Sequence, residues 1–114
     1  MNTRFEVRSS LSRSGTLTLR VQGDLDAAAA GHLTRIVTGC IGDVRACVVN
    51  LSRCGFVDSA GVKQLLQCRR LLDGELSVVG AVPAVERVLT ITGLDEVMAI
   101  QPAAESLAMT ASAG

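Results

Sequence analysis

The chain has 114 residues, of which 48% are hydrophobic and 19% charged, so we expect one compact domain over residues 1–110 with a frayed tail at 111–114. Eleven basic residues balance eleven acidic ones, which leaves no net charge to attract DNA, RNA or an anionic membrane surface. Because the chain has only two aromatic residues to stack on a base, no apolar run long enough to span a membrane and no secretory leader, we expect a soluble, cytoplasmic protein without direct nucleic-acid contact.

The first part of the chain predicts a hairpin followed by a helix. Residues 15–23 alternate strictly between apolar and polar side chains, which is typical of a half-buried strand. Residues 5–7 repeat the pattern more weakly, and the turn-forming segment 12–15 lies between the two. Asp26 then precedes a stretch with apolar residues at helical spacing that reaches Cys40, so we expect a helix capped by Asp26.

The rest of the chain alternates between strand and helix patterns. Residues 46–51 form a short, β-branched apolar run, as expected of a central strand. The further expected elements are a helix over 62–72, a strand over 76–79, a helix that begins at Pro83 and is ended by Gly93, a strand over 97–100 and a helix from Pro102 to Leu107. This order predicts an α/β fold: a mixed, mostly parallel sheet of about five strands with an N-terminal hairpin, packed with about four helices.

Two acidic loops are expected at the same end of this sheet. Asp24 and Asp26 follow the second strand of the hairpin, and Asp58 with Ser59 follows the central strand; a helix comes after each loop. Because the carboxyl ends of parallel strands lie at one edge of a sheet, these side chains should lie near one another, at the edge where ligands and partners bind.

Ser59 is expected at the first turn of a helix, where backbone N–H groups lack intrahelical acceptors. These donors and the positive end of the helix dipole can accommodate a phosphate, so phosphorylation of Ser59 need not unfold the helix. A phosphoserine adds about −1.5 to −2 charges beside the negative Asp58, which would repel a partner that accepts the neutral surface. The simpler alternative is that Asp58 and Ser59 only cap the helix, a common use of both residue types.

Catalytic and cofactor-binding roles have little support in the sequence. A serine nucleophile needs a base, but the only histidine, His32, is expected to face solvent on the first helix, and the GxSxG signature is absent around Ser59. Neither GxxxxGK[ST] nor GxGxxG occurs, so nucleotide binding has no motif. We therefore expect no enzymatic activity and no cofactor.

The four cysteines do not form a metal-binding pattern. They follow one another at steps of seven, seven and fourteen residues, without a CxxC pair, at Cys40, Cys47, Cys54 and Cys68. We expect no metal site, and reduced, buried or partly buried thiols that pack as small apolar residues. Because Cys54 lies in an expected loop, a reactive role stays open for it.

Several segments together resemble the STAS domains and, within that family, the stand-alone anti-sigma-factor antagonists of bacteria. The resemblance lies in these segments, in chain order: Gly23-Asp24-Leu25-Asp26, Val48-Val49-Asn50-Leu51, Gly55-Phe56-Val57-Asp58-Ser59-Ala60-Gly61-Val62, Gly80 to Leu89, and Thr92-Gly93-Leu94. Each segment is weak alone, but their order and spacing are specific. The resemblance implies a sheet flanked by helices.

The resemblance also implies a function in transcription regulation. In such systems the unphosphorylated antagonist binds an anti-sigma factor that has a serine-kinase fold, and this frees a sigma factor. Phosphorylation of the motif serine prevents binding, and a separate phosphatase reverses it. Ser59 matches the phosphoacceptor and Asp58 the acidic residue before it. Gly61 matches the glycine that allows close approach, while Asp24 and Asp26 match the acidic loop that meets the kinase.

The expected docking surface for this partner combines both loops with the start of the following helix: Asp24, Asp26, Asp58, Ser59, Gly61, Val62 and Leu65. One departure from the family is Ala60, which replaces a second Ser or Thr and leaves Ser59 as the only acceptor of the motif. Two alternatives stay open. One is a constitutive STAS subunit of a transporter or stress-signalling complex, in which Ser59 is never modified; the other is a nucleotide- or small-ligand-binding sensor.

Overall fold

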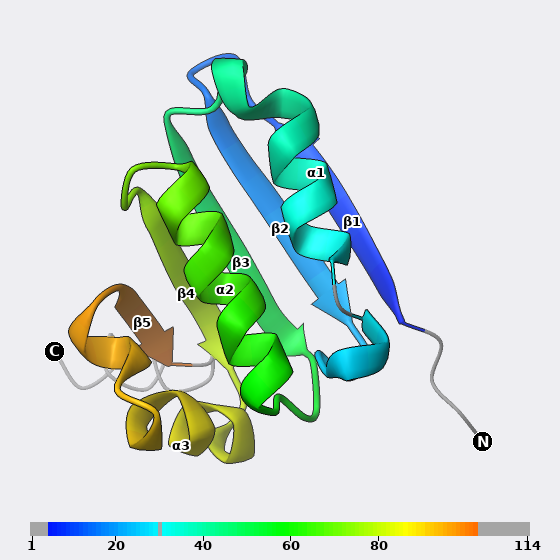
Figure 1. Ribbon diagram of the computed structural model, residues 1–114, viewed down its shortest axis with the longest axis vertical. Helices are drawn as coiled ribbons and strands as arrows, with labels where there is room; N and C mark the ends of the chain where they lie inside the picture. Colours follow the sequence, from blue (N-terminus) through cyan, green and yellow to red (C-terminus); the bar gives the residue numbers. More distant parts are fainter. Residues whose placement is uncertain (1–4, 30, 103–114) are drawn as a thin grey trace, which may run out of the picture.

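The computed structural model describes residues 5–29 and 31–102 and shows one mixed sheet (Figure 1). Its strands lie side by side in chain order: β1 (Glu6–Leu11), β2 (Thr16–Gln22), β3 (Ala46–Arg53), β4 (Leu76–Ala81) and β5 (Ala99–Pro102). β1 and β2 form an antiparallel hairpin, whereas every later pair of neighbours is parallel. The predicted mixed, mostly parallel sheet of five strands with an N-terminal hairpin is confirmed.

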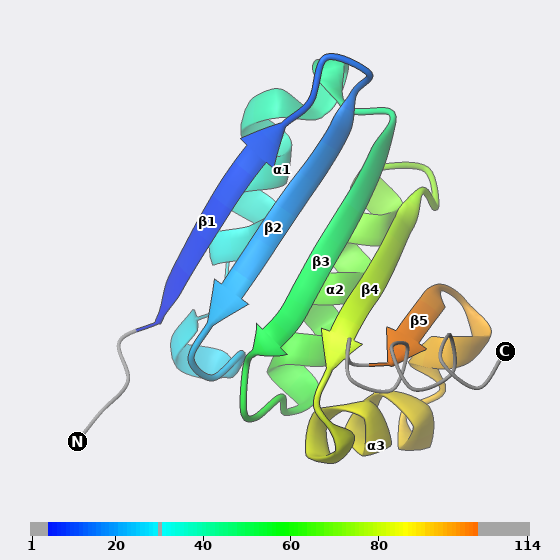
Figure 2. The same ribbon diagram turned by 180° about the vertical axis from the view of Figure 1, so that it is seen from behind.

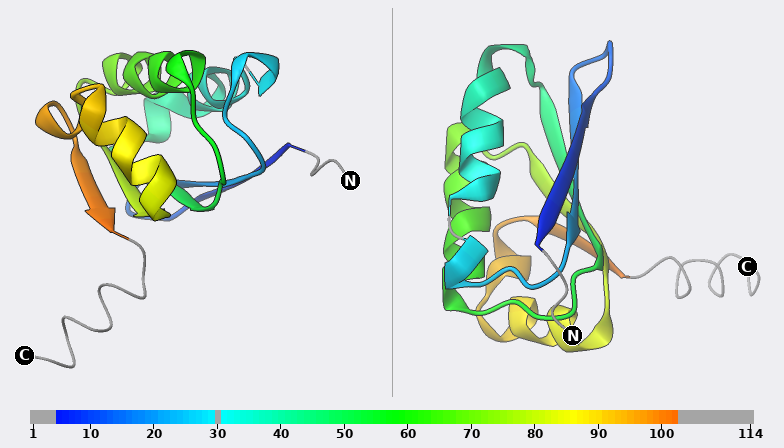
Figure 3. Two further views of the ribbon diagram at one scale, coloured as in Figure 1. Left: turned by 90° about the horizontal axis from the view of Figure 1, so that it is seen from below. Right: turned by 90° about the vertical axis from the view of Figure 1, so that its right-hand side faces the viewer.

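The helices lie on one side of the sheet. α1 (His32–Cys40) and α2 (Ser59–Leu71) pack side by side over one face, and α3 (Pro83–Ile91) lies near the carboxyl end of β4 (Figures 1 and 3). In the described part of the chain no helix covers the opposite face, which Figure 2 shows in front. The strands β2, β3 and β4 therefore bury one set of alternate side chains beneath the helices and present the other set on a more open face.

The core lies between the sheet and these helices. Leu19, Val49 and Val78 stand at the same level of β2, β3 and β4, and all three are fully buried. Leu33 of α1 and Leu65 of α2 belong to the same hydrophobic cluster and are also fully buried. The residues between the buried ones on each strand are more exposed, which explains the alternation in the sequence.

The first helix is shorter than the sequence predicts. Instead of one helix from Asp26, the structure has a 3₁₀ turn, η1 (Ala27–Ala29), and α1 begins only at His32. Gly31 has left-handed backbone angles, with φ of 88°, and so interrupts a right-handed helix. Asp26 consequently caps η1 rather than α1: its Oδ1 accepts hydrogen bonds from the second and third N–H groups of η1, at 3.0 and 3.2 Å.

The C-terminal part also differs from the prediction. The described residues contain three α-helices and two further 3₁₀ turns, η2 (Ile41–Asp43) and η3 (Leu94–Glu96). The last strand begins at Ala99 rather than at residue 97, because η3 ends just before it. The fourth expected helix was to begin at Pro102, but this residue ends β5, and the remainder of that helix lies outside the described residues.

Candidate functional site

The two acidic loops pack against each other at the carboxyl ends of β2 and β3. Leu25 and Val57 form a parallel β-bridge. The N–H of Leu25 donates to the carbonyl of Phe56 at 2.9 Å, and the carbonyl of Leu25 accepts from the N–H of Asp58 at 3.4 Å. The prediction that both loops share one edge of the sheet is therefore confirmed. We call the edge formed by residues 24–26 and 56–59 the switch edge.

Gly61 allows α2 to begin directly against the loop that follows β2. It is buried, and a Cβ at this position would collide with the carbonyl oxygen of Leu25 and lie 3.0 Å from a methyl carbon of Val57. The close approach that this glycine permits is thus between α2 and a neighbouring loop of the same chain. Gly61 does not lie on the free surface, contrary to its place in the predicted docking surface.

Asp58 and Ser59 are the cap and the first residue of α2. Asp58 has extended backbone angles, and its Oδ1 accepts a hydrogen bond from the N–H of Gly61 at 3.0 Å, so Asp58 caps the helix as the simpler alternative expects. The Ser59 side chain is exposed and bonds to no described residue. The N–H groups of Ser59 and Ala60 also lack acceptors among the described residues, so both can donate to an oxyanion on Ser59.

The outward face of α2 near Ser59 carries a lysine. Residues four apart on a helix are neighbours, and Lys63 is exposed one turn after Ser59. By contrast, Val62 is only 7% exposed and Leu65 is fully buried. The sequence places these two residues on the docking surface, but the structure corrects this, because their side chains belong to the core.

The switch edge is acidic. Asp24 is exposed and makes no hydrogen bond with a described residue. Asp26 and Asp58 are half-buried, because each caps the element that follows it. A phosphate on Ser59 would therefore be added to an edge that already carries three formal negative charges. Of the three carboxylates, that of Asp24 is the most available to a partner.

Phe56 is a surface residue that the predicted docking surface omits. Its side chain is 50% exposed, whereas the neighbouring Val57 is 2% exposed. Its backbone is held in place, because its carbonyl accepts both the N–H of Leu25 and the thiol of Cys54, the latter at 3.2 Å. An exposed aromatic side chain on a fixed backbone is typical of an interface anchor. The signal in the sequence that could have indicated this residue is a bulky apolar side chain directly after Gly55 in the motif loop.

Burial disfavours the thiolate form of the cysteines in the core. Burial raises the pKa of Cys47 and Cys68 to about 12. Burial also raises the pKa of Cys54; hydrogen bonds with the backbone of Phe56 and Leu25 offset part of this increase, and the negative charges of Asp24 and Asp26 add to it. Since the thiolate is the nucleophile, a reactive role for Cys54 has no support. All four cysteines are free in the structure, and each is buried or partly buried, which agrees with the predicted packing of their side chains.

His32 lies at the start of α1, away from any arrangement that would activate a serine. It is exposed, and its ring packs edge-on against Phe5 with 5.1 Å between the ring centroids. Across residues 5–29 and 31–102, no three His, Cys, Asp or Glu side chains gather as metal ligands would. In the same residues no helix is long and apolar enough to cross a membrane.

Comparison with known proteins identifies relatives of this fold. The family model of the STAS domain matches residues 9–107. The structure is similar to an anti-sigma factor antagonist from Mycobacterium paratuberculosis, with 27% sequence identity, 97% of each chain covered and a TM-score of 0.78. It is also similar to the Bacillus cell fate determinant SpoIIAA in its phosphorylated form, with 23% identity, 92% of this chain and 99% of that chain covered and a TM-score of 0.66.

The unphosphorylated form of SpoIIAA, an anti-sigma factor antagonist, matches equally well, with 22% identity, 96% of this chain and 99% of that chain covered and a TM-score of 0.68. A sulfate transporter family protein from Wolinella succinogenes is similar too, with 13% identity, 84% of this chain and 83% of that chain covered and a TM-score of 0.71. At these identities the likeness concerns the fold alone. The fold is thus shared by antagonists and by a transporter-family protein.

Proposed function

Since the chain belongs to the STAS domain family, we propose that it is an anti-sigma-factor antagonist that binds an anti-sigma factor until Ser59 is phosphorylated. The partner would supply the serine-kinase activity, and a phosphoserine phosphatase would restore the binding form. The chain itself acts by binding rather than by catalysis. The observation that carries the proposal is the exposed Ser59 hydroxyl at the first residue of α2, beside two backbone N–H groups that have no acceptor among the described residues.

The structure of the switch edge supports a switch by charge rather than by refolding. Asp58, and not Ser59, caps α2, so a phosphate on Ser59 leaves the capping hydrogen bond in place. The phosphate would find donors in the first-turn N–H groups and a cation in Lys63, one turn along. The similarity of the fold to both forms of SpoIIAA agrees with a fold that tolerates this modification.

Repulsion and desolvation then explain how the partner is released. A partner that covers Phe56 must remove water from the adjoining switch edge. With a neutral Ser59 this requires little, because Asp24 is the only exposed one of the three aspartates there and Asp26 and Asp58 are already half-buried. A phosphate adds about −1.5 to −2 charges at the same place, and burying a charge without a matching cation is strongly unfavourable.

The test combines phosphate mapping with binding measurements. The purified chain is mixed with each anti-sigma kinase of its own host and ATP, and the phosphate is located by mass spectrometry. We expect one phosphate, on Ser59. Ser59→Ala should bind the same kinase and stay bound when ATP is added, while Ser59→Asp should bind at least about tenfold more weakly.

A matched control is available in the hairpin. Ser10 is an exposed serine of β1 whose side chain makes no hydrogen bond with a described residue, so Ser10→Ala should behave as the unchanged protein in these assays. Equal binding by Ser59→Ala and Ser59→Asp, or a phosphate on another residue, would refute the proposal.

The likeness to a sulfate transporter family protein favours one alternative, a constitutive subunit of a transporter or related complex. In that case Ser59 stays unmodified and packs at a permanent interface. Intact mass spectrometry of the chain isolated from its host distinguishes the two functions. A single unphosphorylated species that co-purifies with a membrane protein would support the alternative.

A further inference from the structure

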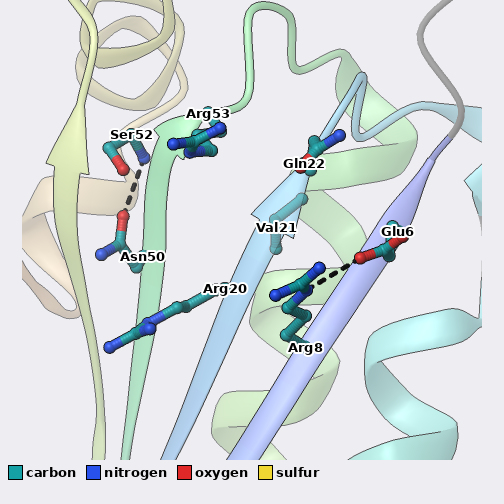
Figure 4. Close-up of a pocket in the computed structure, with 8 residues that line it drawn as sticks. All are labelled: Glu6, Arg8, Arg20, Val21, Gln22, Asn50, Ser52 and Arg53. Atoms are coloured by element: carbon teal, nitrogen blue, oxygen red, sulfur yellow. Dashed lines mark hydrogen bonds and ion pairs between the residues drawn. The ribbon is translucent and has the colours of Figure 1, made fainter.

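The open face of the sheet holds a hollow that takes no part in the proposed switch. Its volume is about 280 Å³, and residues of β1 and of the carboxyl-terminal parts of β2 and β3 line it, as drawn in Figure 4. It lies on the face of the sheet opposite α1 and α2, the face that Figure 2 shows in front. Side chains of β1, β2 and β3 line it, and all but one valine are polar. The hollow therefore calls for a polar ligand.

The lining of this hollow is basic. Arg8, Arg20 and Arg53 line it, and Glu6 is its only carboxylate, which leaves two excess positive charges. In Figure 4 Arg53 lies at the end of β3, Arg8 lies beside Glu6 on β1, and the side chain of Arg20 extends from β2 across β3. Glu6 pairs with Arg8 through a contact of 2.9 Å between Oε2 and Nε. Among the described residues Arg20 and Arg53 have no ion-pair partner. Guanidinium groups without carboxylate partners are well suited to bind oxyanions through paired N–H donors.

Asn50 adds a fixed neutral donor to the same place. Its Oδ1 accepts the N–H of Ser52 at 2.9 Å, which orients the amide and leaves its NH₂ group to donate. Arg20 stands opposite Asn50 in the parallel register of β2 and β3, so both side chains leave the same face. Gly80 keeps the neighbouring space free, because a Cβ there would lie 3.2 Å from both Asn50 Oδ1 and Ser52 Cβ.

From this arrangement we infer that the hollow is a binding site for a compact oxyanion of two or more negative charges, for which a phosphate group is the simplest example. Arg20, Arg53 and Asn50 line it from two neighbouring strands, and their N–H groups are donors suited to the several oxygens of such an anion. The volume lies at the lower limit of small-molecule pockets, and no aromatic side chain lines it, so a nucleotide base has no stacking partner. Free phosphate and a small phosphate monoester both fit this chemistry.

The test is titration of the full chain with inorganic phosphate and, separately, with glycerol phosphate, followed by backbone-amide NMR and calorimetry. Sodium chloride at matched ionic strength is the blank, since it reproduces general screening. We expect saturable shifts around Arg20, Asn50 and Arg53 with both anions and none with chloride. The anion that binds more tightly identifies free phosphate or a monoester as the source.

Variants make the assignment specific. Arg20→Gln and Arg53→Gln should each weaken binding by about tenfold, and Glu6→Gln, which removes the competing carboxylate, should strengthen it by about threefold. Arg70→Gln changes an exposed arginine on α2 and should leave binding unchanged. Thermal unfolding of each variant verifies its fold. Absence of saturation, shifts centred on Ser59, or unchanged binding in the double variant of Arg20 and Arg53 would overturn the inference.

Discussion

Alanine at position 61 should destabilise the protein, although the same replacement inside an ordinary helix stabilises it by about 0.5–1 kcal/mol. The added methyl group would overlap with the carbonyl oxygen of Leu25 and press on Val57. Neither can move aside easily, because the two residues form the β-bridge that joins the loops of the switch edge. Overpacking costs about 1–3 kcal/mol, and contact with backbone favours the upper part of this range.

The expected net loss for Gly61→Ala is therefore about 2 kcal/mol, the difference between a steric cost of about 3 and a gain in helix propensity of about 1. For a domain of this size that corresponds to a melting temperature lower by about 8 °C. Urea and thermal unfolding followed by circular dichroism measure it; the chain has no Trp or Tyr for fluorescence.

Gly39→Ala is the matched control for this prediction. Gly39 lies within α1, and no atom lies within 4 Å of a Cβ built there. This variant should gain about 0.5–1 kcal/mol, so the two substitutions should have opposite signs. If Gly61→Ala is as stable as the unchanged protein, or more stable, then the loop after β2 moves to make room for the added methyl group. That result would refute the rigid packing of the switch edge.

Three further predictions concern the cap, a buried amide and the thiols. Asp58→Ala should lose about 1 kcal/mol of stability in urea unfolding and Asp58→Asn much less, because asparagine still accepts from the N–H of Gly61; equal losses would contradict the capping role. Gln64→Met should gain about 1 kcal/mol, since both polar atoms of this 3% exposed amide lack partners among the described residues, and a loss would show that the amide has one. In the folded protein the pKa of Cys47 and Cys68 is about 12, above the ordinary 9.0, so the unfolded chain loses these thiol protons at lower pH than the folded protein does. The free energy of unfolding should therefore not depend on these thiols below pH 9 and should fall between pH 9 and 12. Unfolding across this range should show a slope of about 1.4 kcal/mol per pH unit and thiol, and a double alanine variant with the same slope would refute this.

The fold could be predicted from the sequence where a side-chain period determines burial. The alternation over residues 15–23 and the apolar run at 46–51 locate β2 and β3, because one face of each strand is covered by helices. The start of α1 could not be predicted in this way. Alanine has the highest helix propensity, so the run of alanines predicts a helix, and glycine adopts right- and left-handed angles about equally well, so the residue type at position 31 does not reveal the interruption.

The candidate site shows a similar division. The shared edge of the two loops and the cap at Asp58 follow from strand order and helix-start chemistry, which are local or topological features. The burial of Val62 and Leu65 could also have been predicted from the sequence, since they stand three residues apart on the apolar stripe of α2. The predicted docking surface took consecutive residues of the motif together, and consecutive residues of a helix point both toward the core and toward solvent. The exposure of Phe56 depends on tertiary packing and required the structure.

The balance of charges in the composition has a different meaning once the fold is known. Eleven basic and eleven acidic residues give the chain no net charge. Near the carboxyl ends of β2 and β3, however, some of the acidic residues and some of the basic residues form two distinct groups. The switch edge carries the carboxylates of Asp24, Asp26 and Asp58, while the open face beside it carries Arg20 and Arg53. Because screening limits charge effects to about 8–10 Å at physiological ionic strength, a partner responds to the nearer set rather than to the net charge. A neutral chain can thus present an acidic surface and a basic hollow that adjoin each other, since the N–H of Gly23, the residue before Asp24, donates to the carbonyl of Arg53 at 3.1 Å.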